Sequence, residues 1–200
     1  MPKGFTEQEK EQIQQKMLQV ATQLFSTHGL KKTNVEEITR ACGISKGAFY
    51  LFYPSKEALF MAILDEADQT FKREITEAFQ KAAKPLDRET FKIILKNMFK
   101  LMQENPMLRL FKNEDYEYLV RKLDQKQITE HVKGDTQYFR ELYDHFYKLG
   151  IFRQVNPDSL NYFSTSMYLL SLHEELQMLM SFEQLLDFFV DMFAAYLIAP

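Results

Sequence analysis

The chain has 200 residues, of which 46% are hydrophobic and 26% are charged, so it has enough apolar material for a packed core. This composition excludes a disordered tail and a fibrous repeat. The 25 Lys and Arg residues against 28 Asp and Glu residues give a formal net charge of -3, which excludes a polycation that coats nucleic acid. Any DNA binding must therefore come from a local basic patch.

The N-terminal part of the sequence predicts one longer helix followed by short ones. Apolar residues recur at helical spacing from the start, and Gly29 can supply the left-handed residue at which the first helix ends. Asn34, with Thr33 before it, offers a capping-box start for the next helix, and Ser45 can cap the one after it. The predicted helices cover residues 6–28, 35–42 and 45–53, and a fourth begins at Ser55.

The rest of the chain also has helical periodicity, and no segment alternates convincingly as a strand would, so we predict an all-α fold. Breaks are expected at Pro106, Gly134 and Gly150. Asn156 can cap a helix in which Pro157 takes the first position. The predicted helices in this part are 88–104, 106–112, 114–132, 135–149, 157–180 and 182–198.

Three features of the sequence bear on its location. The single cysteine, Cys42, cannot form an internal disulfide and has the character of a small buried thiol, and no signal peptide opens the chain. The last segment is apolar, but Glu183, Asp187 and Asp191 interrupt it on one face, so we expect a packing helix and no membrane span. These features predict a cytoplasmic protein.

Charge and aromatic content differ between two parts of the chain. Residues 1–56 contain 8 Lys and Arg against 5 Asp and Glu, whereas residues 57–200 contain 17 against 23. Only 6 of the 28 aromatic residues lie in the first part. We therefore predict two domains with different roles, divided after residue 56.

Residues 35–53 place a short helix, a turn and a second short helix in a row, which is the helix-turn-helix pattern. Gly43 can take the conformation of the turn, and Ile44 is the apolar residue expected to fill the space between the helices. Ser45 can cap the second helix. The pattern indicates DNA binding through that helix.

The residue types around the second helix suit contact with DNA. Lys46 at its tip suits a phosphate or a guanine, and Gly47 lacks a side chain, so the backbone can approach DNA closely. Tyr50 can donate its hydroxyl to a phosphate, and Lys56 at the next helix N-terminus also attracts phosphate. The residues expected to face the core instead are Phe49 and Tyr53.

The most specific elements of the first part are Leu24-Phe25 before Gly29, Thr33 and Val35 leading to Ile38, Gly43-Ile44-Ser45-Lys46-Gly47, Tyr50, and Ser55-Lys56-Glu57-Ala58-Leu59. With these elements, about residues 10–64 closely resemble the DNA-binding domain of the TetR/AcrR family of bacterial transcriptional regulators. The rest of the chain resembles the family in length and helical pattern. The resemblance implies an N-terminal three-helix DNA-binding domain and a C-terminal helical bundle in a homodimer that a small molecule releases from its operator. The residues predicted to bind DNA are Thr33, Asn34, Ser45, Lys46, Gly47, Ala48, Tyr50, Leu51, Phe52 and Lys56.

The chain departs from the family at one place in the second helix. Members often have Tyr-His-Phe after the residue that matches Tyr50, whereas this chain has Leu51-Phe52-Tyr53. Two positions at which family members often have polar side chains that read bases therefore have apolar side chains in this chain. Either Leu51 and Phe52 contact thymine methyl groups, or Phe52 packs on the first helix and reads no base.

A mostly apolar effector pocket is predicted after residue 85, where Phe, Tyr and Met are frequent and tyrosine hydroxyls can orient a ligand. The plain alternative is that these side chains fill a helical core. No Lys or Arg can be assigned to the pocket, so we expect a hydrophobic or aromatic effector. The predicted pocket residues are Phe99, Met102, Phe111, Tyr116, Tyr138, Phe146, Tyr162, Phe163 and Met167.

The last two helices, 157–180 and 182–199, are predicted to form a homodimer interface. Apolar residues cover more than one face of the final helix, whereas a surface helix needs only one apolar face. The surplus face is expected to pack on a second copy, unless both faces pack within one chain. Two-fold symmetry would place two recognition helices in major grooves about 34 Å apart, on an inverted repeat.

Two other motifs are weaker. The stretch Gly43 to Gly47 fits the G-x-S-x-G nucleophile elbow with Ser45 as nucleophile, but that elbow needs a buried strand before it, and a charged helix precedes this one. The run His173-Glu174-Glu175 is similar to the start of a zinc-peptidase motif, but Gln177 stands where the second histidine is required.

We therefore predict a ligand-responsive DNA-binding transcriptional regulator, most simply a repressor, without a cofactor or resident metal. The helix that begins at Ser55 is expected to couple the two domains. The chief alternative is a dimeric DNA-binding or partner-docking protein with no small-molecule effector. A metal effector held by His131 and His145 is a lesser alternative. An enzyme is the weakest interpretation, because no paired carboxylates, phosphate loop or metal spacing are found.

Overall fold

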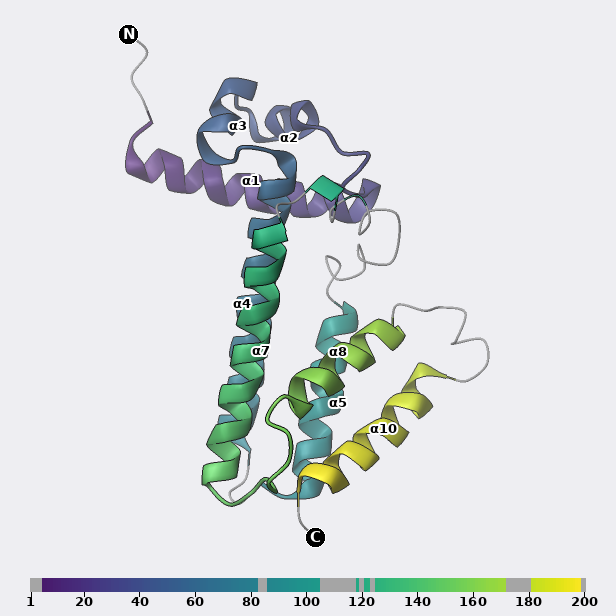
Figure 1. Cartoon of the computed structure of the whole chain (residues 1–200). Helices are drawn as coiled ribbons and strands as arrows, with labels where there is room; N and C mark the ends of the chain where they lie inside the picture. Colours follow the sequence, from purple (N-terminus) through teal and green to yellow (C-terminus); the bar gives the residue numbers. More distant parts are fainter. Residues whose placement is uncertain are drawn as a thin grey trace. The chain divides into compact units, whose positions relative to one another are not determined.

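The computed structural model of the chain describes residues 5–82, 86–104, 118, 121–122, 125–171 and 181–198 (Figure 1). Within these ranges the regular elements are α-helices, and the β contact is an isolated antiparallel bridge between Phe152 and Ile198. The predicted all-α fold is confirmed, and the predicted helix 106–112 lies outside the described residues. The helices are α1 (Glu7–His28), α2 (Val35–Cys42), α3 (Lys46–Phe52), α4 (Lys56–Lys81), α5 (Arg88–Glu104), α7 (Gln125–Lys148), α8 (Ser159–Ser171) and α10 (Phe182–Leu197).

The chain divides into two compact units. The first unit contains Met1–Asp68 and Pro106–Gln125, and the second contains Gln69–Asn105 and Lys126–Pro200. Helix α4 therefore contributes its N-terminal half to the first unit and its C-terminal half to the second. The predicted domain boundary after residue 56 falls in the first turn of this helix and stays a prediction.

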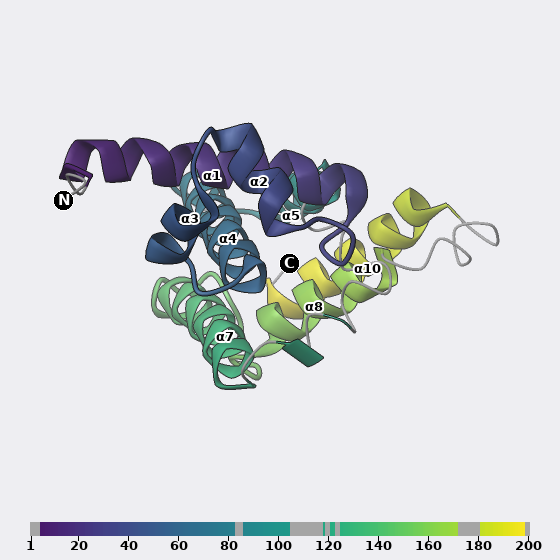
Figure 2. The same cartoon turned by 90° about the horizontal axis from the view of Figure 1, so that it is seen from above.

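The core of the first unit forms around α1. Met17, Ala21 and Phe25 recur at helical spacing on α1 and are fully buried. The ring of Phe25 meets that of Phe60 on α4 edge to face, with centroids 5.5 Å apart. Helices α2 and α3 lie together on one side of α1 (Figures 1 and 2). This packing stabilises two helices that are too short to be stable alone.

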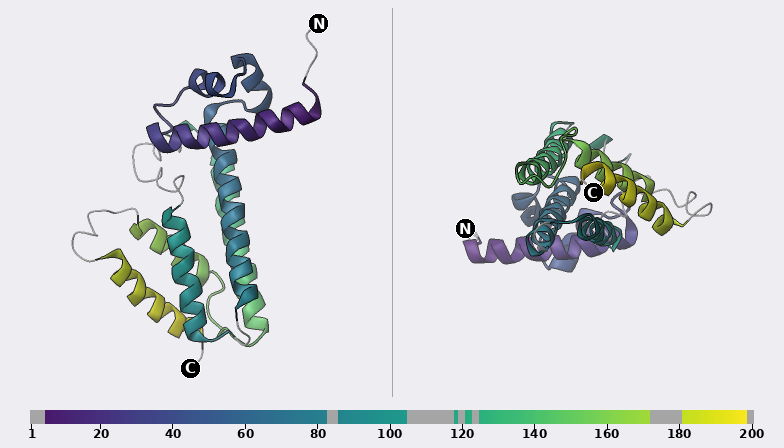
Figure 3. Two further views of the ribbon diagram at one scale, coloured as in Figure 1. Left: turned by 180° about the vertical axis from the view of Figure 1, so that it is seen from behind. Right: turned by 90° about the horizontal axis from the view of Figure 1, so that it is seen from below.

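In the second unit, α7 lies along the C-terminal half of α4 (Figures 1 and 3). The Lys72 ammonium on α4 donates to Oδ1 of Asp135 at 2.7 Å, and the Tyr138 hydroxyl donates to the Lys72 carbonyl oxygen at 2.9 Å. The helix runs through Gly134, so the predicted break there is wrong. A glycine inside a helix costs about 1 kcal/mol relative to alanine, a cost that the contacts of α7 with α4 can offset.

The segment between α7 and α8 begins as predicted and then differs. Gly150, with a φ of 73°, lies in the turn that follows α7. Helix α8 begins at Ser159, not at Pro157 as predicted. The side-chain oxygen of Asn156 accepts the N–H of Asp158 at 2.9 Å, so these residues form a turn before the helix.

Aromatic rings join α5, α8 and α10, which pack against one another in the second unit (Figure 3). Phe163 of α8 stacks on Phe193 of α10 with ring centroids 4.1 Å apart. Phe99 of α5 meets Phe163 edge to face at 5.8 Å. Large rings therefore fill the space between these three helices.

Helix α10 has an acidic face that pairs with α5. The carboxylates of Asp187 and Asp191 lie 2.7 Å and 2.6 Å from the ammonium groups of Lys96 and Lys92. These are two of the acidic residues that argued against a membrane span. In the described part of the chain, no helix combines the length and the apolar character needed to cross a bilayer.

The apolar residues of α10 form two separate stripes, as the sequence predicted. One stripe is buried and includes Leu186, Val190 and Phe193. The other is exposed to solvent in the single chain. Its large residues are Phe188, Met192 and Tyr196.

Candidate nucleic-acid interface

Helix α2 begins with the predicted capping box. The side-chain oxygen of Asn34 accepts the N–H of Glu37 at 2.9 Å, and the Glu37 carboxylate accepts the N–H of Asn34 at 3.0 Å. Two backbone donors at the helix start are satisfied in this way. Asn34 therefore fixes where α2 begins.

The turn between α2 and α3 depends on Gly43. Its φ and ψ are 72° and 30°, a left-handed conformation, so the predicted turn at Gly43 is confirmed. Apart from its two chain neighbours, no atom of the described residues would lie within 4 Å of a Cβ added there, so the penalty for another residue is conformational, about 1–2 kcal/mol. Ile44 follows it, half-buried, and its N–H donates to the Thr39 carbonyl oxygen at 3.0 Å.

Helix α3 begins at the predicted cap. The hydroxyl of Ser45 accepts the N–H of Ala48 at 3.1 Å, and the side chain of Ala48 is buried. Lys46 and Gly47 are exposed. Gly47 does not have a positive φ, and a Cβ added there would approach only the Ser45 hydroxyl oxygen, at 3.9 Å. Neither backbone conformation nor packing within the described chain requires a glycine at this position.

The aromatic residues of α3 divide between the core and the surface. Phe49 and Tyr53 are buried, as predicted, and the Tyr53 hydroxyl accepts a hydrogen bond from Gln14 of α1 at 3.3 Å. Tyr50 and Leu51 are 49% and 75% exposed. The buried pair fixes the orientation of α3 and leaves the opposite face open to solvent.

Phe52 is intermediate in exposure between the buried and the exposed residues of α3. It is half-buried, and the centroid of its ring is 6.4 Å from that of Phe5, which precedes α1. This contact favours the interpretation in which Phe52 packs near the start of the first helix. Leu51 is therefore more exposed than Phe52.

Lys46 forms an ion pair with a residue of α2. Its ammonium nitrogen lies 2.5 Å from Oε1 of Glu36, and both side chains are about half exposed. The hydrogen bond lowers the pKa of Glu36 and raises the pKa of Lys46 from their usual values. Both groups are therefore charged at neutral pH. The ion pair between them was not predicted from the sequence.

Thr33 and Lys56 use their polar groups inside the first unit. The Lys56 ammonium donates to the carbonyl oxygens of Leu30, Lys31 and Thr33, at 2.7, 3.2 and 2.7 Å. Thr33 is buried, and its hydroxyl donates to the Gly29 carbonyl oxygen at 2.8 Å. These side chains hold the segment that leads into α2, whereas the sequence suggested contact with DNA.

The same lysine contacts Tyr118, a residue that the sequence analysis did not single out. The ammonium of Lys56 lies 5.3 Å from the centroid of the Tyr118 ring. The Tyr118 hydroxyl donates to Glu57 at 2.6 Å. Burial raises the pKa of Glu57, but hydrogen bonds, first of all from Tyr118, outweigh burial and lower it overall.

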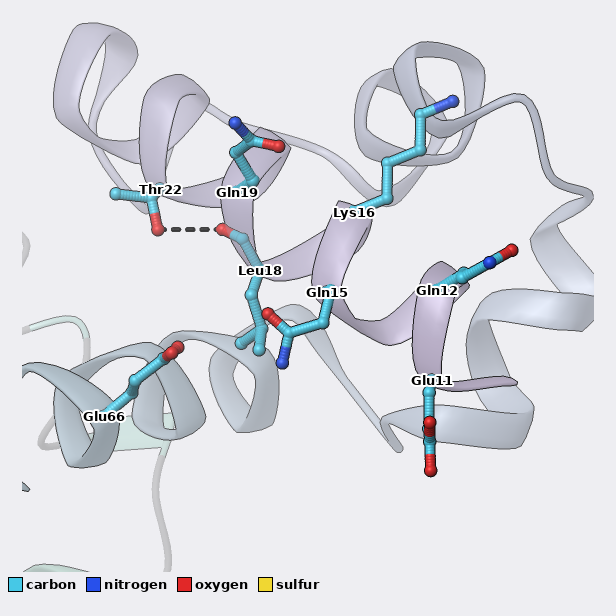
Figure 4. A pocket seen from close by; sticks show the side chains of 8 residues that line it. All are labelled: Glu11, Gln12, Gln15, Lys16, Leu18, Gln19, Thr22 and Glu66. Carbon is cyan, nitrogen blue, oxygen red and sulfur yellow. Dashed lines mark hydrogen bonds between the residues drawn. The ribbon is translucent and has the colours of Figure 1, made fainter. Parts of the chain in front are cut away.

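The predicted effector residues lie in different environments. Tyr162 is exposed and Tyr138 and Phe163 are half-buried, while Phe111 and Tyr116 lie outside the described residues. The buried members are Phe99, Met102, Phe146 and Met167. An open pocket of about 720 Å³ lies in the first unit, and none of these residues lines it (Figure 4). Its lining residues, most of which have polar side chains, are Glu11, Gln12, Gln15, Lys16, Leu18, Gln19, Thr22 and Glu66.

The capped short helices, the left-handed glycine between them and the buried face of α3 define a helix-turn-helix protein with a further helical region. Residues 17–63 match the family model described as bacterial regulatory proteins, tetR family. This region of the chain is therefore similar to the DNA-binding part of TetR-family proteins.

Two curated relatives are similar to part of the chain. The uncharacterized HTH-type transcriptional regulator YuxN of Bacillus subtilis is 46% identical over 66 residues, which cover 32% of this chain and 22% of that protein. The nucleoid occlusion factor SlmA of Actinobacillus pleuropneumoniae is 27% identical over 106 residues, which cover 53% of this chain and 50% of that protein. The chain thus spans half or less of the length of these relatives.

A solved structure is similar over nearly the whole chain. A TetR-family transcriptional regulator from Pectobacterium atrosepticum aligns with a TM-score of 0.65, covering 98% of this chain and 100% of that one. The two sequences are 18% identical. At this identity the similarity shows the fold alone.

Proposed function

We propose that this protein is a transcriptional regulator that binds an operator through α3. The observation that carries the proposal is the exposed surface of this helix, which presents Lys46, Gly47, Tyr50 and Leu51 to solvent. Lysine and tyrosine suit phosphates, an exposed glycine allows close approach, and leucine suits thymine methyl groups. Asn34, which the sequence also predicts to bind DNA, is exposed at the start of α2 and is included in the proposal.

The other five predicted DNA-binding residues have a supporting role in the proposal. Thr33 and Lys56 hold the segment before α2 through their hydrogen bonds. Ser45 and Ala48 are paired in the cap of α3, and Phe52 packs near Phe5. These residues orient the surface that meets DNA.

We further propose a homodimer that forms through α8 and α10. The exposed stripe on α10 repeats every four residues at Phe188, Met192 and Tyr196, with Phe188 59% exposed. Tyr162 and Leu169 of α8 are also exposed and lie seven residues apart, on one face. A two-fold dimer would bury both faces and present two α3 helices to an inverted repeat.

We also propose that a small hydrophobic or aromatic effector regulates DNA binding, and that the protein is most simply a repressor. An effector that binds within the second unit would meet apolar side chains such as Phe99, Phe146 and Met167, which is why we propose a hydrophobic or aromatic one. Helix α4 supports the coupling because one continuous helix contributes to both units. A coupling of about 1–3 kcal/mol would change DNA affinity by roughly 5- to 150-fold.

A second candidate is a DNA-binding protein that docks a protein partner and has no small-molecule effector. The similarity to a nucleoid occlusion factor over 106 residues favours this candidate. A thermal-shift screen with apolar and aromatic compounds separates the two, because only the first candidate predicts a ligand that raises the melting temperature. Neither candidate includes enzyme activity, a cofactor or a metal. The cytoplasmic location stays a prediction.

The DNA-binding proposal is tested by fluorescence anisotropy with duplexes from the regions that flank the gene. A scrambled duplex serves as the control, and each titration is run at two salt concentrations. We expect selective binding to one flanking duplex, weakening as salt rises, because phosphate contacts release counterions. Failure to bind any duplex at low salt would refute the proposal.

A further inference from the structure

A carboxylate lies beside the lysine at the tip of the recognition helix. Glu36 is the second residue of α2, and Lys46 is the first residue of α3. Their side chains cross the turn to form the 2.5 Å ion pair, and both remain about half exposed. The pair therefore lies on the surface of the helix-turn-helix, where a duplex would meet it.

The second carboxylate of this region has a different role. Residues 31–53 contain four cationic side chains and two carboxylates, Glu36 and Glu37. The Glu37 carboxylate accepts the backbone N–H of Asn34 and completes the cap of α2. Helix formation thus accounts for Glu37, whereas the carboxylate of Glu36 acts on Lys46.

The ion pair bears directly on the strength of DNA binding. A lysine that contacts a phosphate gains affinity largely because the phosphate releases its counterions. When a protein carboxylate already holds that lysine, the contact either breaks the ion pair or brings a negative charge to the DNA backbone. Both outcomes weaken binding, and neither depends on the base sequence.

We propose that Glu36 restrains DNA binding by holding the Lys46 ammonium, so that a duplex must compete with this carboxylate for the lysine. The inference rests on the proposed function, because it concerns the strength of the same contact. Glu36 is a positioning residue in this account, since it acts through Lys46. It lowers affinity for all duplexes and so limits binding at sites other than the operator.

The test is the substitution Glu36→Gln, which removes the charge and keeps the size of the side chain. Binding to a labelled duplex of mixed sequence is measured by anisotropy between about 50 and 200 mM salt. We expect affinity to rise about two- to fivefold, the range typical of an exposed ion pair. We also expect a steeper salt dependence, by up to about 0.9 in the slope of log affinity against log salt, the value for one phosphate.

Two further variants make the test specific. Glu77→Gln removes a carboxylate from another exposed pair, Glu77 with Lys81 on α4, and so changes the net charge equally. We expect it to leave affinity unchanged. In a Lys46→Ala background, Glu36→Gln should no longer raise affinity, because the lysine that it frees is absent.

The outcomes separate this inference from the proposed function. If the wild-type protein binds DNA but Glu36→Gln changes neither affinity nor salt slope, the inference is wrong and the proposed function stands. If the gain persists in the Lys46→Ala background, Glu36 repels DNA directly and the restraint through Lys46 is refuted. If the wild-type protein binds no duplex, the proposed function fails, and this inference fails with it.

Discussion

The ammonium group of Lys56, the first residue of α4, donates to the carbonyl oxygen of Thr33 at 2.7 Å, and so ties α4 to the segment that leads into α2. The same ammonium reaches the carbonyl oxygens of Leu30 and Lys31. Charged hydrogen bonds to backbone oxygens are stronger than neutral ones. One lysine, which follows the helix-turn-helix in the sequence, therefore fixes the segment that precedes it.

The substitution Lys56→Met tests this role. It keeps much of the side-chain volume and removes all three hydrogen bonds, so we expect a loss of about 1–2 kcal/mol in the free energy of unfolding. Denaturant titration measures the loss, and Lys81→Met near the end of α4 is the matched control. If Lys56→Met weakens DNA binding at unchanged stability, Lys56 contacts phosphate directly and the structural role is wrong.

Gly47→Ala should move stability and DNA affinity in opposite directions. A methyl group has room within the chain, and alanine favours helix, so we expect about 0.5–1 kcal/mol of added stability. We expect DNA affinity to fall, because the methyl group occupies the space through which a duplex approaches the backbone. Thermal melts and anisotropy measure the two effects. A variant that gains stability and binds DNA as well as the wild type would show that no close approach occurs at Gly47.

The double substitution Phe188→Lys and Met192→Lys tests the proposed dimer. Two charges on the exposed stripe of α10 would have to be buried at the interface, which is strongly unfavourable. We expect sedimentation equilibrium to show a dimeric wild-type protein and a monomeric variant. Val132→Lys, at another exposed apolar residue on α7, should remain dimeric. A monomeric wild-type protein, or a variant that stays dimeric, would contradict the interface.

Local signals were sufficient to predict the helix-turn-helix. The side-chain oxygens of Asn34 and Ser45 cap helices by accepting backbone N–H groups three residues away, and Gly43 supplies a backbone conformation that other residues avoid. Each of these effects depends on neighbours in the chain, so a single sequence contains it. The buried positions of Phe49 and Tyr53 follow from their spacing of four residues.

Contacts between distant residues could not be predicted in the same way. Lys56 meets carbonyl oxygens 23 to 26 residues earlier, and Lys46 meets Glu36 across a turn. Gly134 has the local signature of a break, but the contacts of Asp135 and Tyr138 with α4 outweigh the preference of one glycine. Such effects depend on which surfaces pack together, and helical periodicity does not specify this.

The central claim, that α3 binds DNA, is tested most directly by the double substitution Lys46→Ala and Tyr50→Ala. Its affinity is measured by anisotropy on a duplex that the wild-type protein has selected from a random pool, after thermal melts have shown intact folding. The account predicts a loss of roughly 30-fold or more, because each side chain contributes about 1–3 kcal/mol in such contacts and about 1.4 kcal/mol corresponds to a tenfold change in affinity. An unchanged affinity in a folded variant would contradict it and place the DNA-binding surface elsewhere.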